Sequence, residues 1–172
     1  MDLLNDELLL PITLNYTLKS SDGQSFQVDL VAIKKSGLVN EKIQKNPEET
    51  DIHLPEVEGK TLKKIVEYLL HYKDTDPKEI PRPLKDSKIE NVLDKWDYEF
   101  IIGISMADCI DLINAANYMD ILPLLKLACA RVAAKMIELP LDEVVSTFEI
   151  ECDMSEEETM QFDKYNLSTT ME

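Results

Sequence analysis

Glycine is scarce in this sequence, with 4 among 172 residues. So few glycines disfavour a turn-dense β-sandwich or barrel and favour a helix-rich fold. Cysteine is also rare: Cys109, Cys129 and Cys152 form no Cys-x-x-Cys pair, and an odd number cannot all be bridged. A secreted disulfide scaffold is therefore disfavoured, and we expect reduced thiols in the cytoplasm and nucleus.

Long apolar runs are absent as well. No segment approaches the roughly 20 apolar residues that span a bilayer. The leucine-rich stretch 1–11 carries acidic residues and has no basic residue ahead of its apolar part, unlike a secretory signal. The chain is thus expected to have no membrane segment.

Basic residues are few compared with acidic residues. The sequence has 18 Lys and Arg against 34 Asp and Glu, a net charge of −16. A charge of this sign repels phosphate backbones and anionic lipids, so we expect neither nucleic acid nor membrane as a partner. The 44% of apolar residues is enough for a sizeable core.

Catalytic motifs are missing too. There are 2 histidines, outside any HExxH or Cys/His cluster, and no GxxxxGK[ST], GxGxxG or GxSxG. We expect no cofactor, no metal and no catalytic residue. An enzyme using Cys129 or a carboxylate pair stays as an alternative, but Cys109 and Cys129 both fall in predicted helices, where small buried thiols are common. A binding module is favoured.

The first half of the chain predicts a β-hairpin. Apolar and polar residues alternate around 14–18 and 26–30, and Ser20-Ser21-Asp22-Gly23 between them is typical of a turn. Residues 31–45 predict one or two short helices interrupted at Gly37, and 52–54 a brief strand.

A helix is predicted after the brief strand. Leu62, Ile65, Val66, Leu69 and Leu70 have the spacing of one buried stripe. Residues 73–95 then carry prolines among charged residues, which predicts an exposed, partly mobile loop.

The second half predicts helices. Ser105 and Asp108 resemble a capping box for a helix through Tyr118, and Asp120 is the expected N-cap of the next helix, with Pro123 in its first turn. After a break at Pro140, residues 141–148 predict a two-turn helix. Ser155 with Glu158 predicts a capping box that opens a last acidic helix.

The segment 120–150 is unusually apolar for two short helices. Leu124, Leu125, Val132 and Met136 form the expected stripe of the first helix, and Phe148 lies in the second. Short helices need packing to be stable. Either they cover the core of their own domain, or they form an apolar surface that a partner completes.

Several segments together resemble the Skp adaptor family, the small subunits of SCF-type cullin-RING ubiquitin ligases. These motifs, collinear from about residue 17 to 166, are Leu18 to Gly23, Ile52 to Pro55, His71 to Asp74, Trp96 to Phe100, Ala115 to Ile121, Met136-Ile137, Thr147 to Ile150 and Ser155 to Glu158.

The resemblance implies an α/β fold in which a BTB/POZ-type domain is followed by carboxy-terminal F-box-binding helices. It also implies a non-catalytic adaptor, a heteromeric subunit that links an F-box protein to a cullin. The implied cullin-binding residues are Asn117 and Tyr118. The implied F-box-binding residues are Ile110, Ile113, Leu125, Cys129, Val132, Met136, Val144, Phe148 and Ile150.

The implied organisation is an extension at 1–15, a BTB/POZ-like domain at 16–136 with its loop at 73–95, helices at 137–167 and a tail at 168–172. The family usually ends in Trp-Cys-Glu, whereas this chain ends Asn166-Leu167-Ser168-Thr169-Thr170-Met171-Glu172. This altered ending keeps an alternative open: a structural subunit that binds one F-box-like partner in a cullin-independent assembly.

Overall fold

A computed structural model of the protein describes residues 15–82, 84, 88–148, 155, 157–158 and 160. The chain divides into two compact units, residues 1–135 and 136–172. The described part of the first unit is a small sheet with helices, in agreement with the predicted α/β class. No described helix combines the length and the apolar character of a membrane span.

The predicted hairpin is confirmed. Strands β1 (Asn15–Lys19) and β2 (Ser25–Asp29) are antiparallel, with Leu18 opposite Phe26. Gly23 in the turn between them has φ +82°, which glycine adopts without steric cost. Strand β3 (Asp51–His53) pairs in parallel with the other edge of β1, so the strand order is β2-β1-β3.

Two short helices follow the hairpin, as expected, but their break lies earlier than predicted. Helix α1 (Leu30–Ile33) is capped by Asp29, whose carboxylate accepts from the amide of Ala32 at 2.9 Å. Helix α2 (Gly37–Lys45) begins at Gly37, after the buried N-cap Ser36. Gly37 therefore starts a helix and does not interrupt one.

Helix α3 (Gly59–His71) confirms the helix predicted from the apolar stripe between Leu62 and Leu70. Its buried stripe covers the sheet, except that Leu70 is exposed. The hairpin turn supplies the cap that Glu58 does not: Asp22 accepts from the amide of Gly59 at 2.9 Å. A carboxylate at this end also complements the helix dipole.

The segment 73–95 is less exposed than predicted. A 3-10 turn, η1 (Ile89–Asn91), breaks the loop, and Ile89 and Leu93 are buried in the core. These two residues anchor the segment before helix α4 (Lys95–Ile102), so the prediction of an exposed loop is wrong for them.

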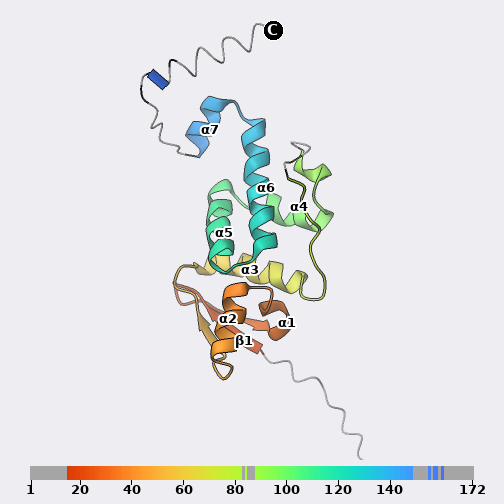
Figure 1. Ribbon diagram of the computed structural model, residues 1–172, viewed down its shortest axis with the longest axis vertical. Helices are drawn as coiled ribbons and strands as arrows, with labels where there is room; N and C mark the ends of the chain where they lie inside the picture. The colour runs from red at the N-terminus through yellow and green to blue at the C-terminus, as the bar shows by residue number, and fades with distance from the viewer. Residues whose placement is uncertain are drawn as a thin grey trace, which may run out of the picture. The chain divides into compact units, whose positions relative to one another are not determined.

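Helices α5 (Met106–Tyr118) and α6 (Leu122–Glu138) complete the larger unit. In Figure 1, α3 lies between the sheet with α1 and α2 on one side and the helices α4 to α6 on the other. Residues from all three layers contribute to one continuous core.

The end of α5 is joined to the start of α2. Ser36 donates its hydroxyl to the carbonyl of Met119 at 2.6 Å, and Gly37 donates its amide to the carbonyl of Asp120 at 3.1 Å. Asp120 has φ +52°, so it is the left-handed residue that ends α5. The prediction of Asp120 as N-cap of α6 is wrong, and the carbonyl of Ile121 accepts the first helical bond, from Leu125.

The second unit contains helix α7 (Leu141–Thr147), which begins after Pro140 as predicted. Farther on, Ser155 accepts from the amide of Glu158 at 3.3 Å, and Glu158 accepts from the amide of Ser155 at 2.9 Å. This reciprocal pair confirms the predicted capping box. The remainder of the predicted last helix, and Ile150, lie outside the described residues.

Candidate protein-interaction surface

Helix α5 supplies one wall of the candidate surface. Ser105 caps it by accepting from the amide of Asp108 at 3.1 Å, and the Asp108 carboxylate also pairs with Lys60. That ion pair is the largest cause of the lowered pKa of Asp108. The apolar residues on the inner side of α5 are buried, whereas Ile110 is 38% exposed and Ile113 is half-buried.

Helix α6 packs beside α5 through small side chains. The thiol of Cys109 on α5 contacts the carbonyl of Ala128 on α6 at 3.6 Å. Ala128, Ala130 and Ala134 on α6 are also buried. Pro123 lies in the first turn of α6, where its missing amide proton costs nothing.

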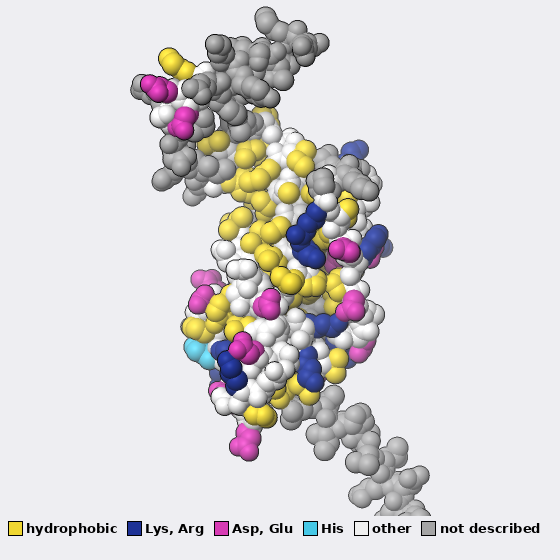
Figure 2. Space-filling view, in the orientation of Figure 1, with side chains coloured by type: hydrophobic (Ala, Val, Ile, Leu, Met, Phe, Trp, Pro, Cys, Tyr) yellow, Lys and Arg dark blue, Asp and Glu magenta, His cyan; other side chains and the backbone are white. Residues whose placement is uncertain are grey.

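Helix α6 carries four of the nine residues predicted to bind an F-box, namely Leu125, Cys129, Val132 and Met136. Leu125 and Val132 are half-buried, and Cys129 is exposed. Leu122, at the start of the helix, is 56% exposed. Figure 2 shows hydrophobic side chains gathered over the region of α5 and α6.

The exposure of Cys129 corrects the sequence prediction, which expected both helical thiols to be buried. Cys109 is buried, and its burial raises the pKa of that thiol to about 11. Cys129 follows the buried Ala128 by one position, which turns it about 100° away from the core at 3.6 residues per turn.

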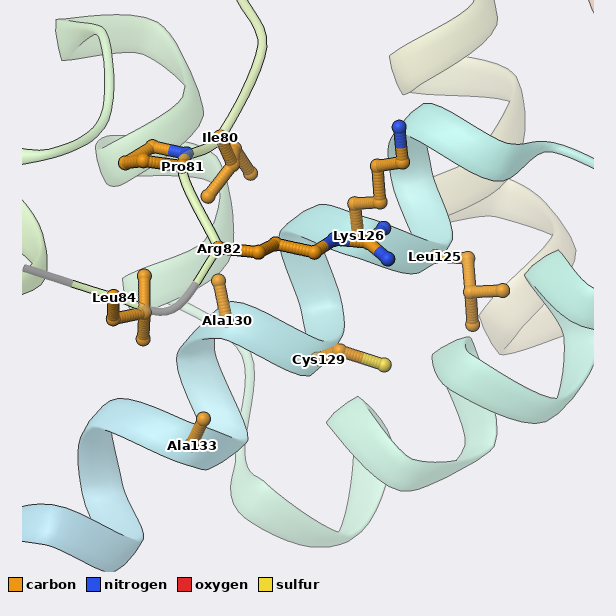
Figure 3. A pocket seen from close by; sticks show the side chains of 9 residues that line it. All are labelled: Ile80, Pro81, Arg82, Leu84, Leu125, Lys126, Cys129, Ala130 and Ala133. Atoms are coloured by element: carbon orange, nitrogen blue, oxygen red, sulfur yellow. The ribbon is translucent and has the colours of Figure 1, made fainter.

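A pocket of about 410 Å3 opens on this side of α6. The loop before η1 forms one wall and α6 forms the other (Figure 3). Its lining residues are Ile80, Pro81, Arg82, Leu84, Leu125, Lys126, Cys129, Ala130 and Ala133. Two residues predicted to bind an F-box therefore share one hollow, which the sequence did not reveal.

The other predicted residues on described helices occur in two places. Met136, the first residue of the second unit, is 36% exposed, and Val144 and Phe148 in that unit are half-buried. Asn117 is exposed at the end of α5, and Tyr118 is half-buried, which raises the pKa of its hydroxyl.

An aromatic cluster joins helix α3 to helix α4, and sequence reasoning missed it. The ring of Trp96 stacks on His71 with centroids 3.6 Å apart and on Phe100 at 5.0 Å. Asp97, which is 3% exposed, accepts the hydroxyl of Tyr72 at 2.8 Å. Its burial is the largest cause of a pKa above the ordinary value.

The described residues form no cluster suited to a metal ion. No group of three or more His, Cys, Asp or Glu side chains is placed there to hold a metal ion. The arrangement of α5 and α6 instead offers apolar and half-buried side chains, which are suited to contact with another protein.

Comparison with known proteins decides the family. Two sequence profiles match, one described as the Skp1 family, tetramerisation domain, over residues 15–74 and one as the Skp1 family, dimerisation domain, over residues 123–166. The S-phase kinase-associated protein 1 homolog of Tetrahymena thermophila is 37% identical over 149 residues, 87% of this chain and 90% of the relative. The chain belongs to the Skp1 family.

Two plant members of the Skp1 family are also similar to the chain. SKP1-like protein 1A of Arabidopsis thaliana is 30% identical and SKP1-like protein 12 is 34% identical, each over 87% of this chain and 92% of the relative. The predicted resemblance and the POZ domain are thus confirmed. Membership supports an SCF adaptor role in general, and Skp1 family proteins are non-catalytic adaptors, which agrees with the prediction of no enzyme.

The two Skp1 profiles divide the predicted site. The second profile covers the residues predicted to bind an F-box from Leu125 onward, including Ile150. Ile110, Ile113 and the predicted cullin residues Asn117 and Tyr118 lie between the two profiles. Trp96 and Asp97 also lie in that interval.

Proposed function

We propose that this chain is a non-catalytic adaptor that joins an F-box substrate receptor to a cullin scaffold in an SCF-type ubiquitin ligase. The observation that carries the proposal is the outward side of α6, where Leu125, Cys129 and Val132 are incompletely buried within a segment that matches the Skp1 family. A partner that covers these side chains would remove their apolar surface from water.

The two partner surfaces would share one face of α5. Ile110 and Asn117 are seven residues apart, close to two full turns, and both are exposed. At 1.5 Å per residue they are about 10 Å apart along the axis. We assign the Ile110 end, with α6 and α7, to the F-box and the Asn117 end, with Tyr118, to the cullin.

In this role the adaptor itself supplies no chemistry. By holding a substrate receptor and the scaffold of a ubiquitin-charged enzyme in one complex, it raises the effective concentration of substrate near that enzyme. We assign residues 16–136 to the POZ-like domain and 137–167 to the F-box-binding helices, and we expect the protein in the cytoplasm and nucleus, as imaging of a tagged chain would test.

The experiment is affinity purification of the full chain with identification of its partners, repeated with Asn117→Lys. Recovery of a cullin with several F-box proteins supports the adaptor. Asn117→Lys should lower cullin recovery at least tenfold and leave F-box recovery unchanged, because a partner packed here would have to bury an unpaired ammonium. Asn46→Lys is the matched control, since Asn46 is exposed at the end of α2, where a cation suits the helix dipole.

A second candidate function keeps the contact with an F-box-like partner and omits the cullin. In this case the chain is a structural subunit with one F-box-like partner in a cullin-independent assembly. Recovery of one fixed partner without any cullin, by wild type and Asn117→Lys alike, would select this function over the adaptor.

A further inference from the structure

The pocket on α6 is a built cavity between two segments that are distant in sequence. Ile80, Pro81 and Leu84 stand on the loop side, and Ala130 and Ala133 on α6 leave room because their side chains are small (Figure 3). Its volume of about 410 Å3 falls within the range of sites that accept a ligand or a group of side chains. We call it the Arg82 pocket, with the nine lining residues named above.

Two cations stand at the rim of this apolar cavity. Arg82 reaches from the loop toward α6, where Lys126 is located (Figure 3). Among the described residues, neither side chain has a hydrogen-bond or ion-pair partner. Glu79 lines the adjoining hollow with both, yet no ion pair joins it to either.

Many described lysines of this chain pair with a carboxylate, whereas Arg82 and Lys126 do not. The sequence has 16 more acidic than basic charges, and lysines such as Lys19, Lys35 and Lys45 each pair with a carboxylate. Two like charges at one rim raise the electrostatic free energy of the free protein. A carboxylate from outside would lower it, and the planar guanidinium can bind such a group through two parallel hydrogen bonds.

We propose that the Arg82 pocket binds an acidic segment of the F-box partner, with one large apolar side chain in the cavity and neighbouring carboxylates on Arg82 and Lys126. The inference rests on the proposed function and specifies the chemistry of its partner. Leu125 and Cys129 line the pocket and also belong to the proposed F-box surface. A partner that covers α6 thus reaches the rim without a second interface.

The test uses the full chain and the F-box protein identified by the affinity purification. Binding is measured by calorimetry at low and moderate salt for wild type, Arg82→Glu/Lys126→Glu and Arg82→Gln/Lys126→Gln. We expect the Glu pair to weaken binding at least tenfold at low salt and to reduce the salt dependence, with a smaller loss for the Gln pair. Lys34→Glu/Lys63→Glu makes the same charge change at exposed sites elsewhere and should bind within about twofold of wild type.

The outcomes separate this inference from the function on which it rests. If wild type binds no F-box protein, the proposed function fails and the inference fails with it. If wild type binds and the Glu pair binds equally well, or no more weakly than the control, only the inference is overturned. Tighter binding by the Glu pair would also overturn it, because it would mean that the partner segment at the pocket is basic. If the Glu pair recovers binding to a partner whose carboxylates have been changed to Lys, the result would support direct ion pairing between the pocket rim and that partner.

Discussion

Replacing Tyr72 with Phe tests how much the buried carboxyl of Asp97 depends on one hydrogen bond. Asp97 is 3% exposed, and within the described residues Tyr72 is the only hydrogen-bond partner of its side chain, at 2.8 Å. Phe keeps a ring beside Tyr68 and Trp96 and removes only the hydroxyl. Loss of a bond to a charged or buried group costs about 1.5–3 kcal/mol. We expect a free energy of unfolding lower by about 2 kcal/mol, or a Tm lower by about 4–8 °C.

The pH dependence has a definite sign. Burial raises the pKa of Asp97 above 3.8, so the folded state holds this proton more tightly than the unfolded state does. The resulting stability is complete below about pH 3.8 and is lost as pH rises through the folded-state pKa. The bond from Tyr72 lowers that pKa. Tyr72→Phe should therefore raise the pKa of Asp97 further, so that the loss of stability continues to higher pH. Asp97→Asn cannot titrate at this position and should gain stability relative to wild type as pH rises.

The assay uses the single tryptophan of the chain, Trp96, which lies in the same cluster. Urea unfolding followed by its fluorescence is measured for wild type, Tyr72→Phe, Asp97→Asn and the double variant at about pH 4 and about pH 7. Tyr98→Phe is the matched control, because Tyr98 is half-buried nearby and its hydroxyl has no hydrogen-bond partner among the described residues. A change below about 0.5 kcal/mol for Tyr72→Phe, or a pH-independent difference for Asp97→Asn, would refute the reasoning.

Three further outcomes are expected. At about pH 8, Cys109 should react with a thiol reagent at least a hundredfold more slowly than the exposed Cys129, because a pKa of about 11 leaves about 0.1% thiolate; equal rates by peptide mass spectrometry would contradict this. Gly37→Ala should destabilise the fold by less than about 1 kcal/mol, because the new Cβ would lie 2.0 Å from Oδ2 of Asp120, an exposed side chain that can turn aside; a loss above about 2 kcal/mol in a thermal melt would contradict this. Phe148→Asp should abolish F-box pull-down with little change in melting of the first unit, since a half-buried aromatic that caps the end of a two-turn helix has little packing of its own; a lost first-unit transition would place Phe148 in the core instead.

Local patterns made much of the fold predictable. The alternation around Tyr16 and Val28 and the stripe of α3 are periodic signals over adjacent residues, and both were found as expected. Capping residues such as Ser105 and Ser155 were also recognisable, because a cap involves residues only three positions apart.

Contacts between distant segments could not be read in the same way. Ser36 meets Met119, and Tyr72 meets Asp97, through single hydrogen bonds that leave no periodic trace. The role of Asp120 was misjudged because aspartate suits both an N-cap and a left-handed helix end. Motifs placed most candidate site residues on α5, α6 and α7, but the Arg82 pocket depends on where a loop lies in space.

The bond between Ser36 and Met119 also orders events during synthesis. These residues are 83 positions apart. At about 5–20 residues per second, the ribosome needs roughly 4–17 seconds after Ser36 to add Met119. Throughout that interval the start of α2 has only water for the bonds it later makes with α5. The nascent amino-terminal half, although it contains the whole described sheet, therefore waits for the second half before this junction can close.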